Sequence, residues 1–138
     1  MNKLQIYTDG GARGNPGPAG IGIYVLDQDL KPIFSASDYI GTATNNEAEY
    51  KAFLVSLAWL KDYSQAHQID AVESFLDSKL VVEQINKNWK VKEPRMQKFA
   101  KQAWEIIAGF DFNYQIYHVR REKNKEADAL VNQALDAI

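Results

Sequence analysis

Residues 4–26, LQIYTDGGARGNPGPAGIGIYVL, contain the first signals of the fold. From Leu4 to Asp9 the side chains alternate with a period of two, which predicts a β-strand that ends at Asp9. The next segment, Gly10 to Gly22, holds six of the eight glycines and two of the four prolines, so we expect it to be a loop. Ile21 to Leu26 is typical of a second strand.

The remaining sequence predicts alternating strands and helices. Strands are expected at 32–39, 69–76 and 112–119, and helices at 44–66, 78–86, 94–109 and from Asn124, the expected cap of the last helix, to the C-terminus. Three successive strands with short connections favour an antiparallel meander. The order βββαβααβα therefore predicts an α/β fold in which helices pack on a mixed sheet, within one domain of residues 1–138.

The composition restricts the possible functions. With 138 residues, of which 46% are hydrophobic and 25% charged, the chain has the length of one globular domain. Residues 1–11 continue directly into a strand-like pattern without an apolar signal core, and no stretch approaches the ~20 apolar residues that cross a bilayer, so we expect no secretion signal and no membrane span. We therefore expect a cytoplasmic monomer with no membrane contact and no obligate protein partner. The absence of cysteine excludes disulfides, thiolate metal sites and cysteine nucleophiles, so any bound metal must be held by oxygen.

A local excess of positive charge contrasts with the net charge of -2. Between residues 87 and 101, six basic side chains accompany a single acid, Glu93. The six are Lys87, Lys90, Lys92, Arg95, Lys98 and Lys101. Such a patch is typical of phosphate binding, although a solvated loop and the outer face of a helix would have the same composition.

Two glutamates of the long helix lie on nearly opposite sides of it, because successive residues turn by about 100°. Glu49 shares the apolar stripe that contains Phe53 and Leu60, whereas Glu47 lies beside Lys51 and is expected to form an exposed pair with it. A carboxylate on a buried face is unfavourable unless a cation or hydrogen bonds stabilise it. Glu49 is therefore a candidate functional residue.

Three aspartates occupy similar boundary positions. Asp128 lies at the margin of the apolar face of the last helix, Asp77 follows the apolar end of a strand, and Asp9 ends the first strand. Helix capping by Asp77 and a turn role for Asp9 are competing explanations. If the acids converge with Glu49, divalent cations would relieve their repulsion. Two Mg²⁺ or Mn²⁺ ions ~3.5 to 4 Å apart are suited to phosphodiester cleavage.

Four motifs together resemble type 1 ribonuclease H over essentially the whole chain. They are YTDGGARGNPGPAGIG at 7–22, TNNEAEYKA at 44–52, LDS at 76–78 and REKNKEADAL at 121–130. The resemblance implies a ribonuclease H-like fold, with three antiparallel strands followed by two parallel ones in a five-stranded mixed sheet. It also implies an endonuclease that hydrolyses the RNA strand of RNA/DNA hybrids with two Mg²⁺ ions, or with Mn²⁺ in their place. The products would carry 5′-phosphate and 3′-hydroxyl ends.

The resemblance assigns the catalytic and metal-binding roles to Asp9, Glu49, Asp77 and Asp128. Candidate substrate contacts are Gly10, Gly11, Asn15, Thr44, Asn45, Asn46, Ser78 and Trp89. The glycines allow a close approach of two backbones, and by resemblance Thr44 helps to hold a phosphate of the DNA strand. Helix capping is the alternative role for residues 44–46, and anchoring of the loop is the alternative for Trp89.

The sequence departs from many members of the family in two places, and in both it resembles an archaeal-like branch of the family. The loop 120–124, RREKN, has no histidine, so Arg121 is the candidate for a role near the leaving group, with phosphate contact or solvation as the alternative. His118 alternates with apolar side chains and is expected to be structural. The stretch 86–95 is too short for the long basic protrusion of some relatives, so we expect a modest, salt-dependent affinity.

Two other functions stay open at this point. One is a nuclease of the same superfamily that also cuts double-stranded RNA, because metal chemistry does not select the duplex. The other is a non-catalytic module that binds hybrids, against which the presence of all four carboxylates argues.

Overall fold

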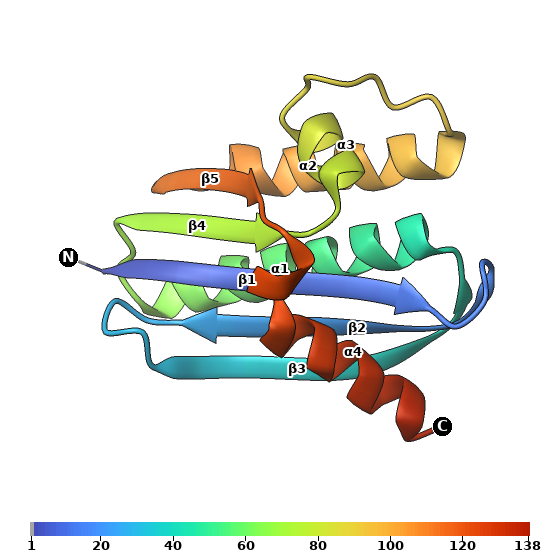
Figure 1. The fold of residues 1–138 in the computed structure, drawn as a ribbon. Helices are drawn as coiled ribbons and strands as arrows, with labels where there is room; N and C mark the ends of the chain where they lie inside the picture. The colour runs from blue at the N-terminus through green and yellow to red at the C-terminus, as the bar shows by residue number, and fades with distance from the viewer. Residues whose placement is uncertain (1) are drawn as a thin grey trace.

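The computed structural model describes residues 2–138 as a mixed sheet of five strands (Figure 1). The strands are β1 (Lys3–Ala12), β2 (Gly17–Leu26), β3 (Pro32–Ala43), β4 (Ala71–Leu76) and β5 (Asn113–His118), and their order in the sheet is β3-β2-β1-β4-β5. The first three strands pair antiparallel, whereas β4 and β5 run parallel to β1. The predicted α/β fold and its split into three antiparallel and two parallel strands are confirmed.

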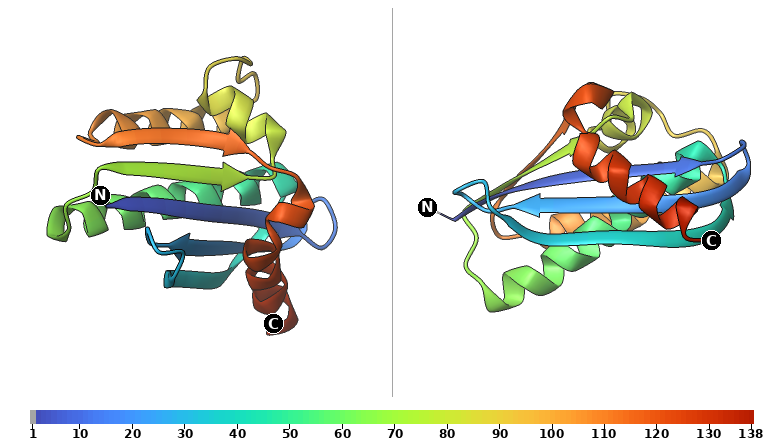
Figure 2. Two further views of the ribbon diagram at one scale, coloured as in Figure 1. Left: turned by 60° about the vertical axis from the view of Figure 1, so that its left-hand side comes forward. Right: turned by 60° about the horizontal axis from the view of Figure 1, so that its bottom comes forward.

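Helices cover both faces of this sheet (Figures 1 and 2). They are α1 (Asn45–Ala66), α2 (Lys79–Ile85), α3 (Pro94–Ala108) and α4 (Lys125–Asp136), with a 3-10 turn, η1 (Arg121–Lys123), before α4. The long helix α1 packs on one face, against β1 and β2, and contacts α3, while α4 crosses the other face over β1, β2 and β3. Within residues 2–138 no helix combines the length and the apolar composition needed to cross a membrane.

The predicted loop at 10–22 is wrong, because most of this segment is strand. β1 continues to Ala12 and β2 begins at Gly17, and Gly11 pairs with Gly20 across the two strands. Close helix packing explains the glycines. A Cβ atom at Gly10 would lie 2.2 Å from the Ala48 carbonyl oxygen of α1, and one at Gly22 would lie 2.2 Å from the Ala127 carbonyl oxygen of α4. These glycines let both helices approach the sheet.

The buried face of α1 is the stripe that the sequence predicted. Phe53, Ser56 and Leu60 are fully buried. Around them, apolar side chains of the sheet and of α3 form the core, including Leu76, Ile116 and Ala103. Since Glu49 belongs to the same stripe, its side chain starts from the sheet side of α1 near the end of β1.

Candidate active site

Three carboxylates from different elements come together at one edge of the sheet. Asp9 lies in β1 directly after the last β1–β4 pair, Thr8–Leu76, and Asp77 directly follows β4. Because β1 and β4 are parallel neighbours, these two aspartates lie side by side. Glu49 joins them from α1, which packs on the face of β1. One carboxylate oxygen from each of the three residues lies within 4.8 Å of the others. Asp9 does not end its strand as predicted, but it stands where the pairing with β4 ends.

A backbone amide joins two of these acids. The N–H of Gly10 donates to Asp9 Oδ1 at 2.9 Å and to Glu49 Oε1 at 2.6 Å. This shared donor holds the Glu49 carboxylate beside Asp9. A larger residue than glycine would push α1 away from β1, because its Cβ would overlap the Ala48 carbonyl. Gly10 therefore has a structural reason to be glycine at the site.

The charges in this cluster are not balanced by basic side chains. Burial, followed by the charge of Asp77, raises the pKa of Asp9 to about 7. Burial, followed by the charges of Asp9 and Asp77, raises the pKa of Glu49 well above its ordinary value. Neither of the two ion pairs found in residues 2–138 involves these carboxylates. A cluster of oxygen ligands that lacks a cation fits a hard divalent metal ion.

Asp128 reaches the same site from α4 but stands outside the tight group of three. It lies close enough to Asp9 to contribute to the raised pKa of Asp9, after burial and Asp77. Its Oδ2 lies 3.5 Å from Asn132 Nδ2, one turn further along α4. Asp128 is half-buried, as Glu49 and Asp77 are, and lines the same cleft.

Most of the predicted catalytic and substrate residues line one cleft. The cleft has a volume of about 330 Å³, and its walls include Asp9, Gly10, Gly11, Asn45, Asn46, Glu49, Asp77, Ser78, Arg121 and Asp128. Arg121, in the exposed turn η1, also lines this cleft. Ser78 also caps α2, since its Oγ accepts from the Val81 N–H at 3.3 Å. The fold thus gathers residues from both ends of the sequence.

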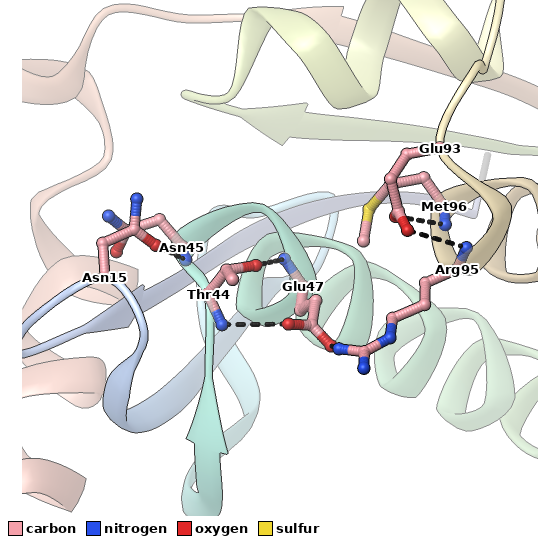
Figure 3. A network of polar contacts seen from close by, with 7 residues as sticks. All are labelled: Asn15, Thr44, Asn45, Glu47, Glu93, Arg95 and Met96. Carbon is pink, nitrogen blue, oxygen red and sulfur yellow. Dashed lines mark hydrogen bonds and ion pairs between the residues drawn. The ribbon is translucent and has the colours of Figure 1, made fainter.

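A second groove, of about 740 Å³, adjoins this cleft at Asn46. Its walls include Asn15, Thr44, Asn46, Lys90, Lys92 and Arg95. The Asn45 N–H donates to Asn15 Oδ1 at 3.0 Å, which ties the start of α1 to the segment between β1 and β2 (Figure 3). Predicted substrate contacts and part of the basic patch therefore share one groove.

The N-terminus of α1 carries a capping box. Thr44 Oγ1 accepts from the Glu47 N–H, and Glu47 Oε1 accepts from the Thr44 N–H, both at 3.1 Å (Figure 3). Thr44 thus has the capping role that was the alternative explanation for it. Thr44 also lines the basic groove, so its capping role is compatible with a contact to substrate. That contact stays a prediction.

The predicted pair between Glu47 and Lys51 is wrong. Glu47 Oε2 instead contacts Arg95 Nη1 at 3.2 Å, because the first turn of α3 lies beside the first turn of α1 (Figure 3). The Thr44 N–H, followed by the Arg95 guanidinium, lowers the pKa of Glu47. The Glu93 side chain caps α3 through the N–H groups of Arg95 and Met96.

Trp89 lies outside the carboxylate cleft. It is 44% exposed, and Lys79 Nζ lies 5.9 Å from the centre of its ring. With Trp104 and Lys87 it lines a separate pocket of about 530 Å³, which borders the basic groove at Lys90. This position is compatible with substrate contact and with anchoring of the loop, so its role stays a prediction.

Two residues differ from what the sequence predicted. His118 is exposed at the end of the edge strand β5, so it is not a buried structural histidine. Asn124 does not cap α4 through its side chain. It is fully buried, and its Nδ2 donates to the Thr8 carbonyl oxygen at 2.9 Å. From sequence alone, an asparagine directly before a helix predicts an N-cap. No pattern in the sequence indicates the hydrogen bond from Asn124 to Thr8 instead.

Comparison with known proteins agrees with this arrangement. Residues 7–134 match the family described as reverse transcriptase-like. Ribonuclease HI of Halobacterium salinarum is 39% identical over 97% of the chain, and ribonuclease H of Ruthia magnifica is 34% identical over 100% of the chain and 99% of its own length. The chain belongs to the type 1 ribonuclease H family.

Within the ribonuclease H family, the fold is closely similar to that of LC11-RNase H1, which was isolated from compost by a metagenomic approach. The structure of that protein in complex with RNA/DNA hybrid matches with a TM-score of 0.91 and 42% identity, over 97% of both chains. The chain spans 65% of the length of the Halobacterium ribonuclease HI and 36% of the length of three further matching proteins.

Proposed function

We propose that residues 1–138 act as one ribonuclease H domain, an endonuclease that hydrolyses the RNA strand of RNA/DNA hybrids. The observation that carries the proposal is the set of three convergent carboxylates, Asp9, Glu49 and Asp77, whose charges lack basic partners within residues 2–138. Membership of the ribonuclease H family supports the reaction class. The hybrid complex of LC11-RNase H1 supports the substrate class.

We infer that these three residues, with Asp128, hold two Mg²⁺ ions, for which Mn²⁺ can substitute. The donors in the cluster are carboxylate oxygens, which suit hard divalent ions. Burial, followed by the neighbouring carboxylate charges, raises the pKa values of Asp9 and Glu49, and a cation would stabilise their ionised forms. When bound, such ions supply Lewis-acid stabilisation of the scissile phosphate and an activated water. The products then carry 5′-phosphate and 3′-hydroxyl ends.

The chain's own residues would orient the duplex over the cleft. Gly10 and Gly11 lack side chains, so a sugar-phosphate backbone can approach β1 closely. Asn45, Asn46 and Ser78 line the same cleft and offer groups that can sense a 2′-hydroxyl. Arg121 lines the cleft as well, where its permanent charge would stabilise the leaving oxygen.

The other strand would lie along the basic groove. Asn15 and Thr44 line this groove together with Lys90 and Lys92, which suits the phosphates of the DNA strand. Trp89, beside the groove, would lie against the sugar-phosphate backbone. Because the basic patch is short, we expect a modest affinity, and because its lysines would act on phosphates, that affinity should fall as salt rises.

Cleavage of labelled duplexes tests the proposal. RNA/DNA hybrid, single-stranded RNA, duplex RNA and duplex DNA are each incubated with Mg²⁺, Mn²⁺ or EDTA, and the product ends are identified. We expect efficient cleavage of the hybrid alone, only with metal, and with 5′-phosphate products. Equal cleavage of duplex RNA would indicate a broader nuclease. Hybrid binding without cleavage would indicate a binding module.

We also infer a cytoplasmic monomer that needs no obligate protein partner. The basis is that the core is formed by the elements of this chain. Light scattering coupled to gel filtration, at the concentrations used for cleavage, gives the mass of the active species. A dimer mass, or activity that appears only after addition of a second protein, would contradict this inference.

A further inference from the structure

Asn124 connects the strand that carries one carboxylate to the helix that carries another. Its side-chain Nδ2 donates to the carbonyl oxygen of Thr8, the residue before Asp9, at 2.9 Å. Its backbone carbonyl accepts from the N–H of Asp128 at 3.0 Å. One fully buried residue is thus bonded on one side to β1 next to Asp9 and on the other side to Asp128 itself.

The contact between Asn124 and Thr8 occurs where the pairing of β1 with β4 ends. The last pair of this ladder is Thr8–Leu76, and β4 ends there, one residue before Asp77. The amide of Asn124 therefore bonds to β1 at the end of this ladder. The turn η1 places it there, since it folds residues 121–123 back before α4 begins.

The side chain of Asn124 is only partly satisfied. Its Nδ2 gives the buried Thr8 carbonyl a donor, so loss of this donor would leave a buried acceptor without a partner, which costs free energy. Its Oδ1 is buried and has no hydrogen-bond partner among residues 2–138, which is unfavourable. An asparagine with one satisfied and one unsatisfied group fits a side chain that holds the first turn of α4 against β1.

We infer that Asn124 is a positioning residue, which holds the first turn of α4 against β1 so that Asp128 faces Asp9. This inference rests on the proposed metal site, in which Asp128 joins the group of Asp9, Glu49 and Asp77 from α4. Asn124 would act through Asp128 and would contact neither metal nor substrate. Residues that orient metal ligands typically contribute about 10- to 100-fold in metal affinity or activity.

The test replaces Asn124 by leucine, which has a similar size but cannot donate to Thr8. Titration calorimetry with Mn²⁺, without nucleic acid, measures metal affinity, and thermal unfolding in EDTA measures stability. We expect Asn124→Leu to bind Mn²⁺ about 10- to 100-fold more weakly. At a fixed, subsaturating Mn²⁺ concentration, kcat on a hybrid should fall by a similar factor while KM for the hybrid stays unchanged. Gln133→Leu, an exposed amide of the same helix, is the control and should match the wild type.

A second substitution separates positioning from folding. In an Asp128→Asn background, Asn124→Leu should cause no further loss of Mn²⁺ affinity, because its effect passes through Asp128. An equal loss in both backgrounds, or an unchanged affinity with only a lower Tm, would overturn the inference. If the leucine variant does not fold, Asn124→Ser, which is too short to reach Thr8, answers the same question. Failure of the wild type to cut hybrids would reject the proposed function and leave the Mn²⁺ measurements readable.

Discussion

Two glutamates in the first turns of α1 have opposite electrostatic surroundings. Glu47 accepts from the Thr44 N–H and pairs with Arg95, and its pKa is lowered. Glu49, two residues later, lies among two other carboxylates, and its pKa is raised, first by burial and then by their charges. The same side chain on the same helix is thus stabilised as an anion in one place and destabilised in the other.

The difference separates a structural network from the proposed metal site. The capping network satisfies the charge of Glu47 and joins α1 to α3. The carboxylates of the cluster have no basic partner in an ion pair within residues 2–138, which weakens the folded protein, and binding of the proposed cation would offset this. Changes in the cluster should therefore affect activity most and can even increase stability, whereas changes in the network should reduce stability and leave the chemistry intact.

The largest effect is expected from Asp77→Asn. Loss of one proposed metal ligand removes several kcal/mol of transition-state stabilisation, so hybrid cleavage should fall about a thousandfold or more. The circular dichroism spectrum should be unchanged, because Asp77 lies after β4 and outside its ladder. Asp62→Asn, on the exposed side of α1, is the control and should cleave at the wild-type rate. A normal rate for Asp77→Asn would reject the metal assignment.

Asp9→Asn should stabilise the metal-free protein at high pH. Burial raises the pKa of Asp9 from 3.8 to about 7, so the folded state disfavours the ionised form. Stability is therefore full below about pH 4 and is lost as the pH rises through about 7, whereas asparagine does not ionise. In EDTA at pH 8 the variant should gain on the order of 4 kcal/mol, and the two proteins should converge near pH 4.

Urea denaturation of both proteins at several pH values measures this difference. Asp38→Asn, at an exposed position of β3, should show no such pH-dependent gain. Saturating Mg²⁺ should raise the stability of the wild type at pH 8 more than that of Asp9→Asn. If Asp9→Asn is less stable than the wild type at pH 8 in EDTA, the cluster does not destabilise the fold.

Glu47→Ala should weaken the structural network. It removes the reciprocal cap of α1 and the pair with Arg95, so the free energy of unfolding should fall by about 1 kcal/mol. Glu47→Gln should lose less, because a glutamine can keep the capping box. The kcat on hybrids should stay near the wild-type value in both variants. Glu105→Ala, an exposed glutamate of α3, is the matched control in urea denaturation.

The smallest effect is expected in the basic groove beside this network. Lys90 and Lys92 line it, and neutralising both to glutamine should reduce the slope of log affinity against log salt by about 2. KM for the hybrid should rise a few-fold at low salt, with kcat unchanged. Fluorescence anisotropy of a labelled hybrid across a salt series measures the slope. Lys61→Gln, exposed in α1, should keep the wild-type slope, and a wild-type slope in the double variant would remove these lysines from the interface.

Much of the fold follows from local patterns. The strand and helix order and the buried stripe of Phe53, Ser56 and Leu60 agree with the structure, because backbone geometry sets the spacing of apolar residues. The split of the sheet into three antiparallel and two parallel strands is implied by the family resemblance, and the structure agrees with it. The segment 10–22 does not, because its glycines serve close helix packing as well as a turn. Composition cannot distinguish these two uses of glycine.

The same division applies to the site. Helical spacing selects Glu49 over Glu47 as the inward carboxylate, and the lack of cysteine requires oxygen ligands. The pairing of Glu47 with Arg95 and the burial of Asn124 against Thr8 join residues 48 and 116 positions apart. The periodicity of a sequence predicts which face of its helix or strand a side chain lies on. The atoms that it meets there belong to distant segments, which only the packing of α1, α3 and α4 around the sheet brings into contact.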